Sequence, residues 1–379
     1  MHIFEWIEIA KEKKASDLHL AVGSPPLIRV NGNLTRIDSY APSTSADVKA
    51  AFVQITPLEA LEKFEKDHEL DFKYMMSDGT SLRCNAALER GQLSLSIRIL
   101  PPVIRTIDEL ELPEVCKKLA SLERGLIIIS GPTGSGKTTT QAAMIQYINT
   151  NQTRHVLSFE DPIEYSHPNI NSKVTQRELG GDTNSFAAAM KHALRHDPDV
   201  IVVGEMRDGE TAGAVISLAE TGHLVISTGH APSAAQCVER IVDLFPYSER
   251  FLVQMRLASL LTAVLCQTLV PRADGSGRIA VVEIMLVNSA IRNLIREGKL
   301  TMLADAIRDY GQAGNVTLDE ALFRLYWQGI ITMESVTRYC RNPDEITRLN
   351  KQSLTGKKSP AAKVGGPVNT SVNQDKKPK

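Results

Sequence analysis

A glycine-rich segment followed by a lysine and two threonines has the residue types that phosphate chemistry needs. It reads Gly131-Pro132-Thr133-Gly134-Ser135-Gly136-Lys137-Thr138-Thr139 and fits the spacing GxxxxGK[ST]. Glycines let backbone N–H groups approach a phosphate chain without a Cβ in the way, and a helix that begins here presents its positive end to the anion. Lys137 is expected to reach the β- and γ-phosphates of a nucleotide, and the Thr138 hydroxyl to bind Mg²⁺.

The surrounding sequence supplies the elements that this loop requires. Residues 126–130 form a short, mostly apolar run, long enough for one buried strand, and a helical pattern begins after the loop. A glycine-rich turn that binds nothing is the alternative, but it gives no reason for a strand, a loop and a helix in this order. The sequence therefore predicts a nucleotide-binding P-loop.

Acidic residues follow two other predicted strands. Glu205 comes after the apolar residues 200–203, near the position where an aspartate ordinarily holds Mg²⁺. A carboxylate there can order the attacking water or take its proton. Glu160, Asp161 and Glu164 follow the strand predicted at 155–159, where they are expected to help bind Mg²⁺ or to orient water. The alternatives are a surface glutamate and a charged loop, respectively.

A histidine ends a further apolar strand. His230 follows the strand predicted at 223–228, and ligands of α/β proteins bind at the carboxyl ends of such strands. Its imidazole is expected to contact the γ-phosphate or to couple to Glu205. His223, at the other end of the strand, is at least as well explained by capping or packing.

The composition fits a globular chain of two or three domains. The chain has 379 residues, of which 42% are hydrophobic, and a formal net charge of -1. The near-neutral charge argues against nucleic acid as the main partner. The five cysteines are scattered without CxxC spacing, which argues against a structural zinc site. The N-terminus is polar and no apolar run is long enough to span a bilayer, so we expect a cytoplasmic protein.

The first hundred residues predict a compact α+β domain. A helix is expected over residues 1–14 and two more over 45–66, and Asn31-Gly32 between apolar residues is a hairpin signal. The strands are expected at 16–20, 26–30, 70–74, 82–86 and 93–99. Pro101-Pro102 marks a linker over residues 101–114 that could act as a hinge.

Alternating strand and helix patterns over residues 115–345 predict a parallel α/β sheet. The expected strands are 126–130, 155–159, 200–204 and 223–228, with 266–270 and 279–284 as further candidates, and 289–341 is expected to be mostly helical. Beyond this region Lys, Pro, Ser, Gly and Asn predominate, which predicts a disordered tail over 346–379.

Together these segments resemble the type IV pilus retraction ATPases, the PilT/PilU family of the secretion ATPase superfamily. The resemblance runs from about residue 1 to residue 345. The motifs that carry it are Ser16-Asp17-Leu18-His19, the P-loop, Glu160 to Glu164, Gln176-Arg177-Glu178, Gly204-Glu205-Met206-Arg207-Asp208, Thr221-Gly222-His223 to His230, and Ala290-Ile291-Arg292-Asn293-Leu294-Ile295-Arg296-Glu297. The resemblance implies a PAS-like domain (1–100), a RecA-like ATPase domain with C-terminal helices (115–345) and a homohexameric ring.

The resemblance also implies catalytic roles. The P-loop would bind ATP, and Mg²⁺ would be held by Thr138 with Glu160 and Glu164 as candidates. Glu205 resembles the catalytic glutamate of the family. Glu164 resembles the acid of its "Asp box" and His230 the histidine of its "His box".

Arginines and partners follow from the same resemblance. Arg83 and Arg98 match N-terminal-domain arginines that reach the nucleotide, and Arg240 matches a position that senses the γ-phosphate. The implied partners are further copies of the chain, an inner-membrane pilus platform protein and, optionally, a second retraction ATPase, with no nucleic acid. The motor would lie peripherally at the cytoplasmic face of the inner membrane, and residues 290–297 would couple it to retraction.

The chain departs from the family pattern at the His box. The usual Thr-Leu-His-Thr is Thr228-Gly229-His230-Ala231 here. Besides a principal retraction motor, the open alternatives are its accessory homologue, an assembly or secretion motor, a RecA-like nucleic-acid translocase and a nonhydrolysing interaction protein. Residues 290–297 favour the principal motor, and the sequence lacks the four-cysteine insert that assembly and secretion motors commonly carry.

Overall fold

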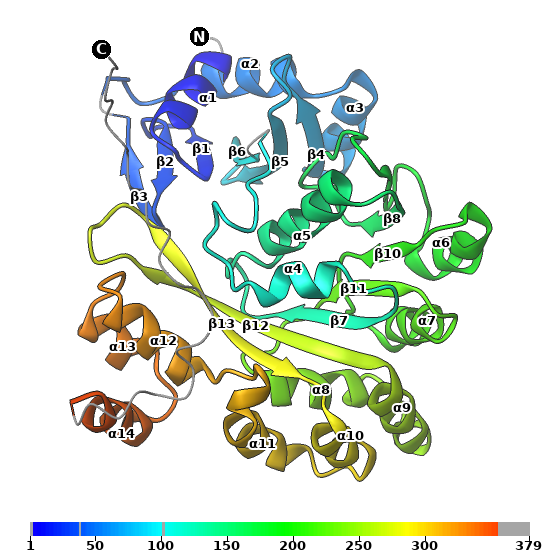
Figure 1. The fold of residues 1–379 in the computed structure, drawn as a ribbon. Coiled ribbons are helices and arrows are strands. Elements are labelled where there is room, and N and C mark those ends of the chain that lie inside the picture. Colours follow the sequence, from blue (N-terminus) through cyan, green and yellow to red (C-terminus); the bar gives the residue numbers. More distant parts are fainter. Residues whose placement is uncertain (1–2, 38, 101–102, 355–379) are drawn as a thin grey trace, which may run out of the picture.

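The computed structural model describes residues 3–37, 39–100 and 103–354, which form two β-sheets with helices around them (Figure 1). A six-stranded sheet lies in the N-terminal part of the chain and a seven-stranded sheet in the rest. The fold is a RecA-like α/β domain with an N-terminal α+β domain and a helical C-terminal region. The predicted linker residues Pro101-Pro102 lie outside the described residues.

The N-terminal sheet is antiparallel, with strand order β3-β2-β1-β6-β5-β4. Its strands are β1 (Asp17–Ala21), β2 (Leu27–Val30), β3 (Asn33–Arg36), β4 (Glu69–Met75), β5 (Ser81–Glu89) and β6 (Gln92–Leu100). Burial alternates along these strands, as in β5, where Leu82, Cys84 and Ala86 point into the core. The helices α1 (Ile3–Glu12), α2 (Ser45–Ile55) and α3 (Leu58–Asp67) pack into the same core.

All five strands predicted here are confirmed, and so is the hairpin. Asn31 and Gly32 have φ of 51° and 88°, and they join β2 to β3 with Val30 opposite Asn33. Only residues that tolerate the left-handed region form this two-residue turn easily. The sequence reasoning identified the turn but missed β3 as a strand, because its four residues are all exposed and show no alternation.

The described part of the predicted linker packs against the second sheet. Ile107 and Leu112 are buried in one cluster with Ile127 and Ile129. Burial of two large aliphatic side chains anchors the chain from Ile107 onward to the second sheet.

The second sheet has the strand order β13-β12-β7-β11-β10-β8-β9. Its strands are β7 (Gly125–Ser130), β8 (His155–Glu160), β9 (Lys173–Glu178), β10 (Val200–Val203), β11 (Leu224–Thr228), β12 (Leu261–Pro271) and β13 (Arg278–Leu286). All neighbouring pairs are parallel except β12 with β13. All six predicted strands are confirmed. The edge strand β9 was missed because five of its six residues are polar and none is fully buried.

Helices cover both faces of this sheet, which explains why its strands are continuous apolar runs. On β7, Ile127 and Ile129 face the cluster that holds α4 (Val115–Ala120) and α5 (Lys137–Asn151). Leu126 and Ile128 face the opposite cluster. That cluster holds α6 (Phe186–Ala193), α7 (Gly209–Glu220), α8 (Ala234–Asp243), α9 (Tyr247–Leu260), α10 (Ser289–Arg296) and α11 (Leu303–Asp309).

Three further helices lie beside the long β12–β13 hairpin (Figure 1). They are α12 (Leu318–Trp327), α13 (Met333–Tyr339) and α14 (Pro343–Leu354), and their apolar residues pack on Val270, Ile279 and Val281. We call α12–α14 the C-terminal helical unit. One prediction is wrong here: the tail was expected to be disordered from residue 346, but the chain is helical up to Leu354. Ile346 and Leu349, spaced i,i+3, are buried in this cluster, and the polar composition of the tail hid that spacing. Residues 355–379 lie outside the described residues.

None of the helices in the described part of the chain combines the length and the apolar character that a membrane span requires.

Candidate functional site

The predicted site segments meet at one edge of the second sheet. The parallel strands β7, β11, β10 and β8 are neighbours, and Val203 lies opposite both Ser227 and Phe159 in register. The carboxyl ends of parallel strands lie at the same edge. The P-loop, the loop after β8, the segment after β10 and the His230 segment therefore emerge side by side, as the sequence predicted.

The P-loop has the backbone that its glycines allow. Gly131 has φ of 143° and Gly136 has φ of 87°, conformations that other residues rarely adopt. A Cβ on Gly131 would lie 2.3 Å from the carbonyl oxygen of Gln267, and one on Gly136 would lie 2.9 Å from Gln267 Nε2. Two of the glycines are thus required both by conformation and by the close approach of β12.

Gln267 is a site residue that sequence reasoning missed. Its Nε2 donates a hydrogen bond to the carbonyl oxygen of Ser135 at 2.8 Å, and its Oε1 accepts one from Thr140 Oγ1 at 2.8 Å. It is 2% exposed, so a polar side chain in the core of β12 braces the loop against the first turn of α5. The one available signal was a glutamine inside an apolar strand pattern.

Lys137 lies inside the curve of the P-loop. Its Nζ donates to the carbonyl oxygens of Gly131 at 2.9 Å and Pro132 at 3.2 Å. Burial lowers the pKa of Lys137, while the negative charges of Glu205 and Glu164 act in the opposite direction. Burial is the largest of these effects on Lys137, and two carboxylates lie near enough to act on its charge.

The hydroxyls of the loop differ in their surroundings. Ser135 Oγ is buried and has no hydrogen-bond partner among the described residues. Thr138 is half-buried, and Thr139 Oγ1 lies 2.9 Å from the Tyr165 hydroxyl. Buried polar groups ordinarily have a hydrogen-bond partner, and a phosphate oxygen in the loop would supply one for Ser135.

Glu205 and His230 are in direct contact. His230 Nε2 lies 2.7 Å from Glu205 Oε1, and Arg207 Nε donates to Glu205 Oε2 at 2.9 Å. Arg207 also lies 3.6 Å from Asp161 in the loop after β8. The contact forms with the small residues Gly229 and Ala231 on either side of His230. The structure therefore places His230 in contact with Glu205, and the catalytic roles of the two residues stay predictions.

The chain around His230 is fixed from the P-loop side. Ser130 Oγ donates to the carbonyl oxygen of Ala231 at 2.9 Å and accepts from its backbone N–H at the same distance. Arg240 donates to the carbonyl oxygen of His230 at 2.6 Å, so its guanidinium lies beside the histidine. The predicted γ-phosphate sensor is thus next to the site, and its role stays a prediction.

The two acidic residues after β8 have different surroundings. Glu160 is buried, and its Oε1 accepts from Ser158 Oγ at 2.6 Å and from Gln176 Nε2 at 2.9 Å. Burial raises the pKa of Glu160 against these hydrogen bonds. Glu164 is half-buried and has no hydrogen bond or ion pair among the described residues. Glu164 is therefore the more available carboxylate for a metal ion or a water.

Arg83 and Arg98 lie in one row of charges across the N-terminal sheet. In register, Lys73 lies opposite Arg83, Arg83 opposite Arg98, and Arg98 opposite Asp17. Arg98 Nε donates to Asp17 Oδ1 at 3.0 Å, while Arg83 is exposed without a polar partner in the described chain. Neither arginine touches the P-loop here, and their predicted approach to nucleotide is untested.

Lys73, the end of that row, does reach the second sheet. Its Nζ donates to the carbonyl oxygen of Ile163 at 3.0 Å and to Glu178 Oε2 at 3.2 Å. The same Glu178 oxygen accepts from the Ile163 backbone N–H at 2.9 Å. The sequence analysis did not identify this contact, which joins the N-terminal sheet to the loop that carries Glu164.

The predicted coupling segment 290–297 coincides with α10. Ile291 and Ile295 are buried, and Arg292 Nε donates to the carbonyl oxygen of Ala258 in α9 at 2.9 Å. The segment is an amphipathic helix packed on α9, away from the nucleotide loop (Figure 1).

Comparison with known proteins places these features in context. The model of the Type II/IV secretion system protein family matches residues 6–338. The chain is 41% identical over 346 residues to the Type IV pilus retractation ATPase PilT of Pseudomonas aeruginosa, covering 91% of this chain and 100% of the relative. It is 38% identical to the Type IV pilus ATPase PilU of the same organism, covering 93% of this chain and 92% of the relative.

Solved structures are similar as well. The crystal structure of the pilus retraction motor PilT with bound ADP superposes with a TM-score of 0.82 at 38% identity, covering 92% of this chain and 99% of that one. The structure of the Legionella pneumophila ATPase DotB superposes with a TM-score of 0.78 at 26% identity, covering 87% of this chain and 93% of that one.

Proposed function

Because this chain belongs to the Type II/IV secretion system protein family, we propose that it is a homohexameric motor ATPase that couples ATP hydrolysis to type IV pilus retraction. The observation that carries the proposal is the Glu205–His230 contact of 2.7 Å beside the P-loop, in a chain that covers all of a retraction ATPase. PilT and PilU, which this chain matches at 41% and 38% identity over nearly their whole length, are named as type IV pilus ATPases, which favours retraction over other secretion functions.

ATP is the proposed substrate, bound by the loop Gly131-Pro132-Thr133-Gly134-Ser135-Gly136-Lys137-Thr138-Thr139. Lys137 would exchange its bonds to Gly131 and Pro132 for the β- and γ-phosphate oxygens. The unpartnered Ser135 hydroxyl would gain a phosphate acceptor. The ADP in the structure of the related retraction motor supports this assignment.

The residues present also fit a magnesium ion. No three His, Cys, Asp or Glu side chains of the described chain gather closely enough to hold a metal alone, but Mg²⁺ in such sites is held largely by phosphates, waters and one hydroxyl. Thr138 would supply the hydroxyl, and Glu164, which has no polar partner here, would hold a bound water. Glu160 is the weaker candidate because its carboxyl is buried and already accepts two hydrogen bonds. The ion would neutralise charge on the phosphates.

Hydrolysis would depend on Glu205. Its carboxylate would order the attacking water or take its proton, with Lys137 stabilising the phosphoryl charge. His230 would hold the Glu205 carboxylate and, with Arg240 behind it, contact the γ-phosphate region. Arg83 and Arg98 would reach the nucleotide when the N-terminal domain closes over its own or the next subunit.

The assembly and location are part of the same proposal. The ring would act on an inner-membrane pilus platform protein from the cytoplasmic face of the membrane. Accessory retraction is the second candidate, because the chain is almost as similar to PilU as to PilT. Residues 290–297, which coincide with α10, carry the resemblance to the segment that would couple the motor to retraction, and they favour the principal motor.

Complementation tests the proposal. In P. aeruginosa lacking its own PilT, the intact chain is expected to restore twitching, whereas Glu205→Gln, expressed at the same level, is not. If the chain restores twitching only in a strain that lacks PilU, and not in one that lacks PilT, its function is accessory retraction. An intact, well-expressed chain that restores neither would contradict retraction, and purified chain that does not hydrolyse ATP would contradict the ATPase itself.

A further inference from the structure

The His230 loop is also held on the side away from the P-loop, by Glu283 of β13. Glu283 is 3% exposed, and its Oε1 accepts from the backbone N–H of Ala234 at 2.6 Å. Ala234 is the first residue of α8, so the carboxylate also lies at the positive end of that helix. One buried carboxylate thus fixes the end of the loop four residues after His230.

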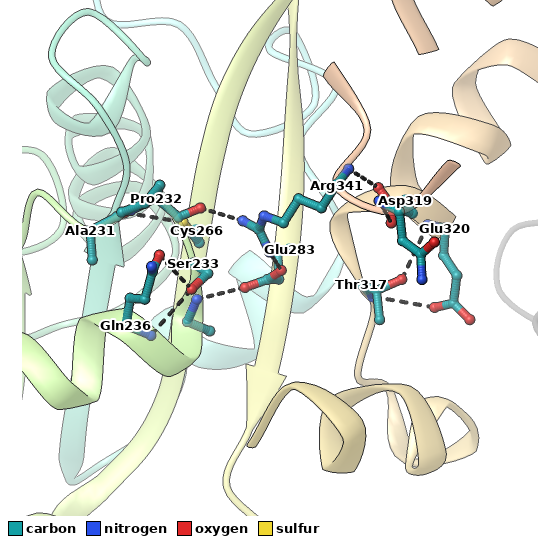
Figure 2. Close-up of polar contacts among 12 residues, drawn as sticks. Ala231, Pro232, Ser233, Gln236, Cys266, Glu283, Thr317, Asp319, Glu320 and Arg341 are labelled. Carbon is teal, nitrogen blue, oxygen red and sulfur yellow. Dashed lines mark hydrogen bonds and ion pairs between the residues drawn. The ribbon is translucent and has the colours of Figure 1, made fainter. Parts of the chain in front are cut away.

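Arg341 completes this grip. It donates one guanidinium nitrogen to Glu283 Oε2 and the other to the carbonyl oxygen of Pro232 (Figure 2). Cys266, opposite Glu283 in register, directs its Sγ to the carbonyl oxygen of Ala231 at 3.3 Å. Ser130 holds Ala231 from the other side, and Ser233 caps α8, so each residue between His230 and α8 makes a polar contact.

The other end of Arg341 belongs to the C-terminal helical unit. Its backbone N–H donates to Asp319 Oδ1 at 2.7 Å, and that of Asn342 donates to Asp319 Oδ2 at 3.0 Å. Asp319 is buried in the first turn of α12, whose start is fixed by a capping box of Thr317 and Glu320. Figure 2 shows Arg341 extending from this helix end to Glu283 and Pro232. A shift of α12 relative to the sheet would therefore pull on the His230 loop.

We propose that Glu283 and Arg341 are positioning residues for His230 and that they connect the C-terminal helical unit to ATP hydrolysis. The inference rests on the proposed ATPase function. A guanidinium presents two donors in a fixed plane, so one side chain can hold a carboxylate and a carbonyl in a set geometry. Displacement of a catalytic group by about 1 Å can cost about a hundredfold in rate. Neither residue touches the predicted nucleotide position, so their loss should change turnover more than affinity.

Three variants test this inference in the full-length chain. Arg341→Met with Glu283→Gln removes both guanidinium contacts without leaving a buried charge unpaired, which a single substitution would do, while the amide oxygen can still accept from the Ala234 N–H. Arg341→Lys keeps the positive charge but loses the planar pair of donors that binds Glu283 and Pro232 at the same time. Arg348→Met is the matched control, since Arg348 pairs with Glu345 within α14 and makes no contact with the His230 loop in the described part of the chain. The measurements are melting temperature, KM and kcat for ATP, and hydrogen exchange of the backbone amides in residues 230–234, of which Pro232 has none.

The double variant is expected to fold, to keep KM within about threefold, and to lose about tenfold or more in kcat, with faster exchange at 230–234. Arg341→Lys should fall between, and Arg348→Met should match the intact chain. Unchanged kcat and exchange in a folded double variant would overturn the inference, as would equal losses in melting temperature, affinity and kcat in all three variants. If the intact chain hydrolyses no ATP, the proposed function fails. Amide exchange at residues 230–234 still shows whether Glu283 and Arg341 hold the His230 loop.

Discussion

His230 Nε2 lies 2.7 Å from Glu205 Oε1, so side chains from the ends of two neighbouring strands meet where the P-loop begins. Glu205 is the less exposed of the two, and Arg207 holds its second oxygen. A carboxylate held from both sides has one orientation, which is what a residue that orders an attacking water needs.

The first prediction separates the two roles in this pair. Glu205→Gln should bind ATP normally and lose about a hundredfold or more in kcat, because the amide cannot take a proton from water. His230→Ala should lose about tenfold, and His230→Gln less, because its amide nitrogen can still reach Glu205. Nucleotide titration and steady-state hydrolysis measure these effects. Near-normal turnover by Glu205→Gln would remove it from catalysis.

The second prediction concerns Arg83 and Arg98. If they reach the nucleotide on domain closure, Arg83→Ala and Arg98→Ala should fold and bind nucleotide but hydrolyse it about tenfold or more slowly. Arg36→Ala, an exposed residue of the same sheet with no polar partner in the described chain, is the control.

Mixing experiments then locate the contact. If each arginine acts on the neighbouring subunit, mixed rings of Arg98→Ala and Glu205→Gln contain some interfaces with both groups intact, and part of the activity returns. Slow variants that never complement each other place the contact within one subunit. Full activity in either arginine variant alone excludes that residue from the site.

The third prediction tests the link through Lys73. Lys73→Met should leave the fold intact, because a partly exposed ion pair contributes only about 1 kcal/mol. Amide exchange at Ile163 should rise by up to about fivefold, since Lys73 and Ile163 share Glu178. Lys63→Met, exposed on α3 without a polar partner among the described residues, should not change it. Equal exchange in both variants would show that the two sheets are not coupled here.

The fourth prediction is a pH dependence at His167. Burial lowers its pKa from 6.5 to about 4, and its Nδ1 is buried without a partner in the described structure. Because the unfolded state binds this proton more readily, stability is full above about pH 6.5 and falls as the pH drops toward 4, by about 3 kcal/mol at most.

Denaturant unfolding at several pH values checks this effect. His167→Gln should flatten the loss between about pH 6.5 and pH 4, whereas His196→Gln, an exposed histidine, should not. Identical pH profiles for the intact chain and His167→Gln would contradict the account.

The sequence was informative where function and local structure coincide. The P-loop glycines, the apolar strands before Glu205 and His230, and the Asn31-Gly32 turn each depend on a few adjacent residues, and the structure has them all. The Glu205–His230 contact was foreseen because parallel strands expose their ends at one edge, although its geometry depends on the strand order.

Contacts between residues far apart in the chain could not be predicted from the sequence. Gln267 lies more than a hundred positions after the P-loop that it braces, and Arg341 is further still, and neither stands in a local pattern. The part of α14 from Ile346 to Leu354 was missed for another reason, because the polar composition of the tail outweighed two buried residues, Ile346 and Leu349. Side chains that act through tertiary packing leave no signature in a single sequence.

Imaging of individual labelled pili tests the central claim most directly. In P. aeruginosa without its own PilT, cells that carry the intact chain should shorten their pili, and cells with equal amounts of the Glu205→Gln chain should extend pili but not shorten them. Retraction at equal speed with both chains, or none with an intact chain that hydrolyses ATP in vitro, would contradict the assignment of this protein as an ATP-driven retraction motor.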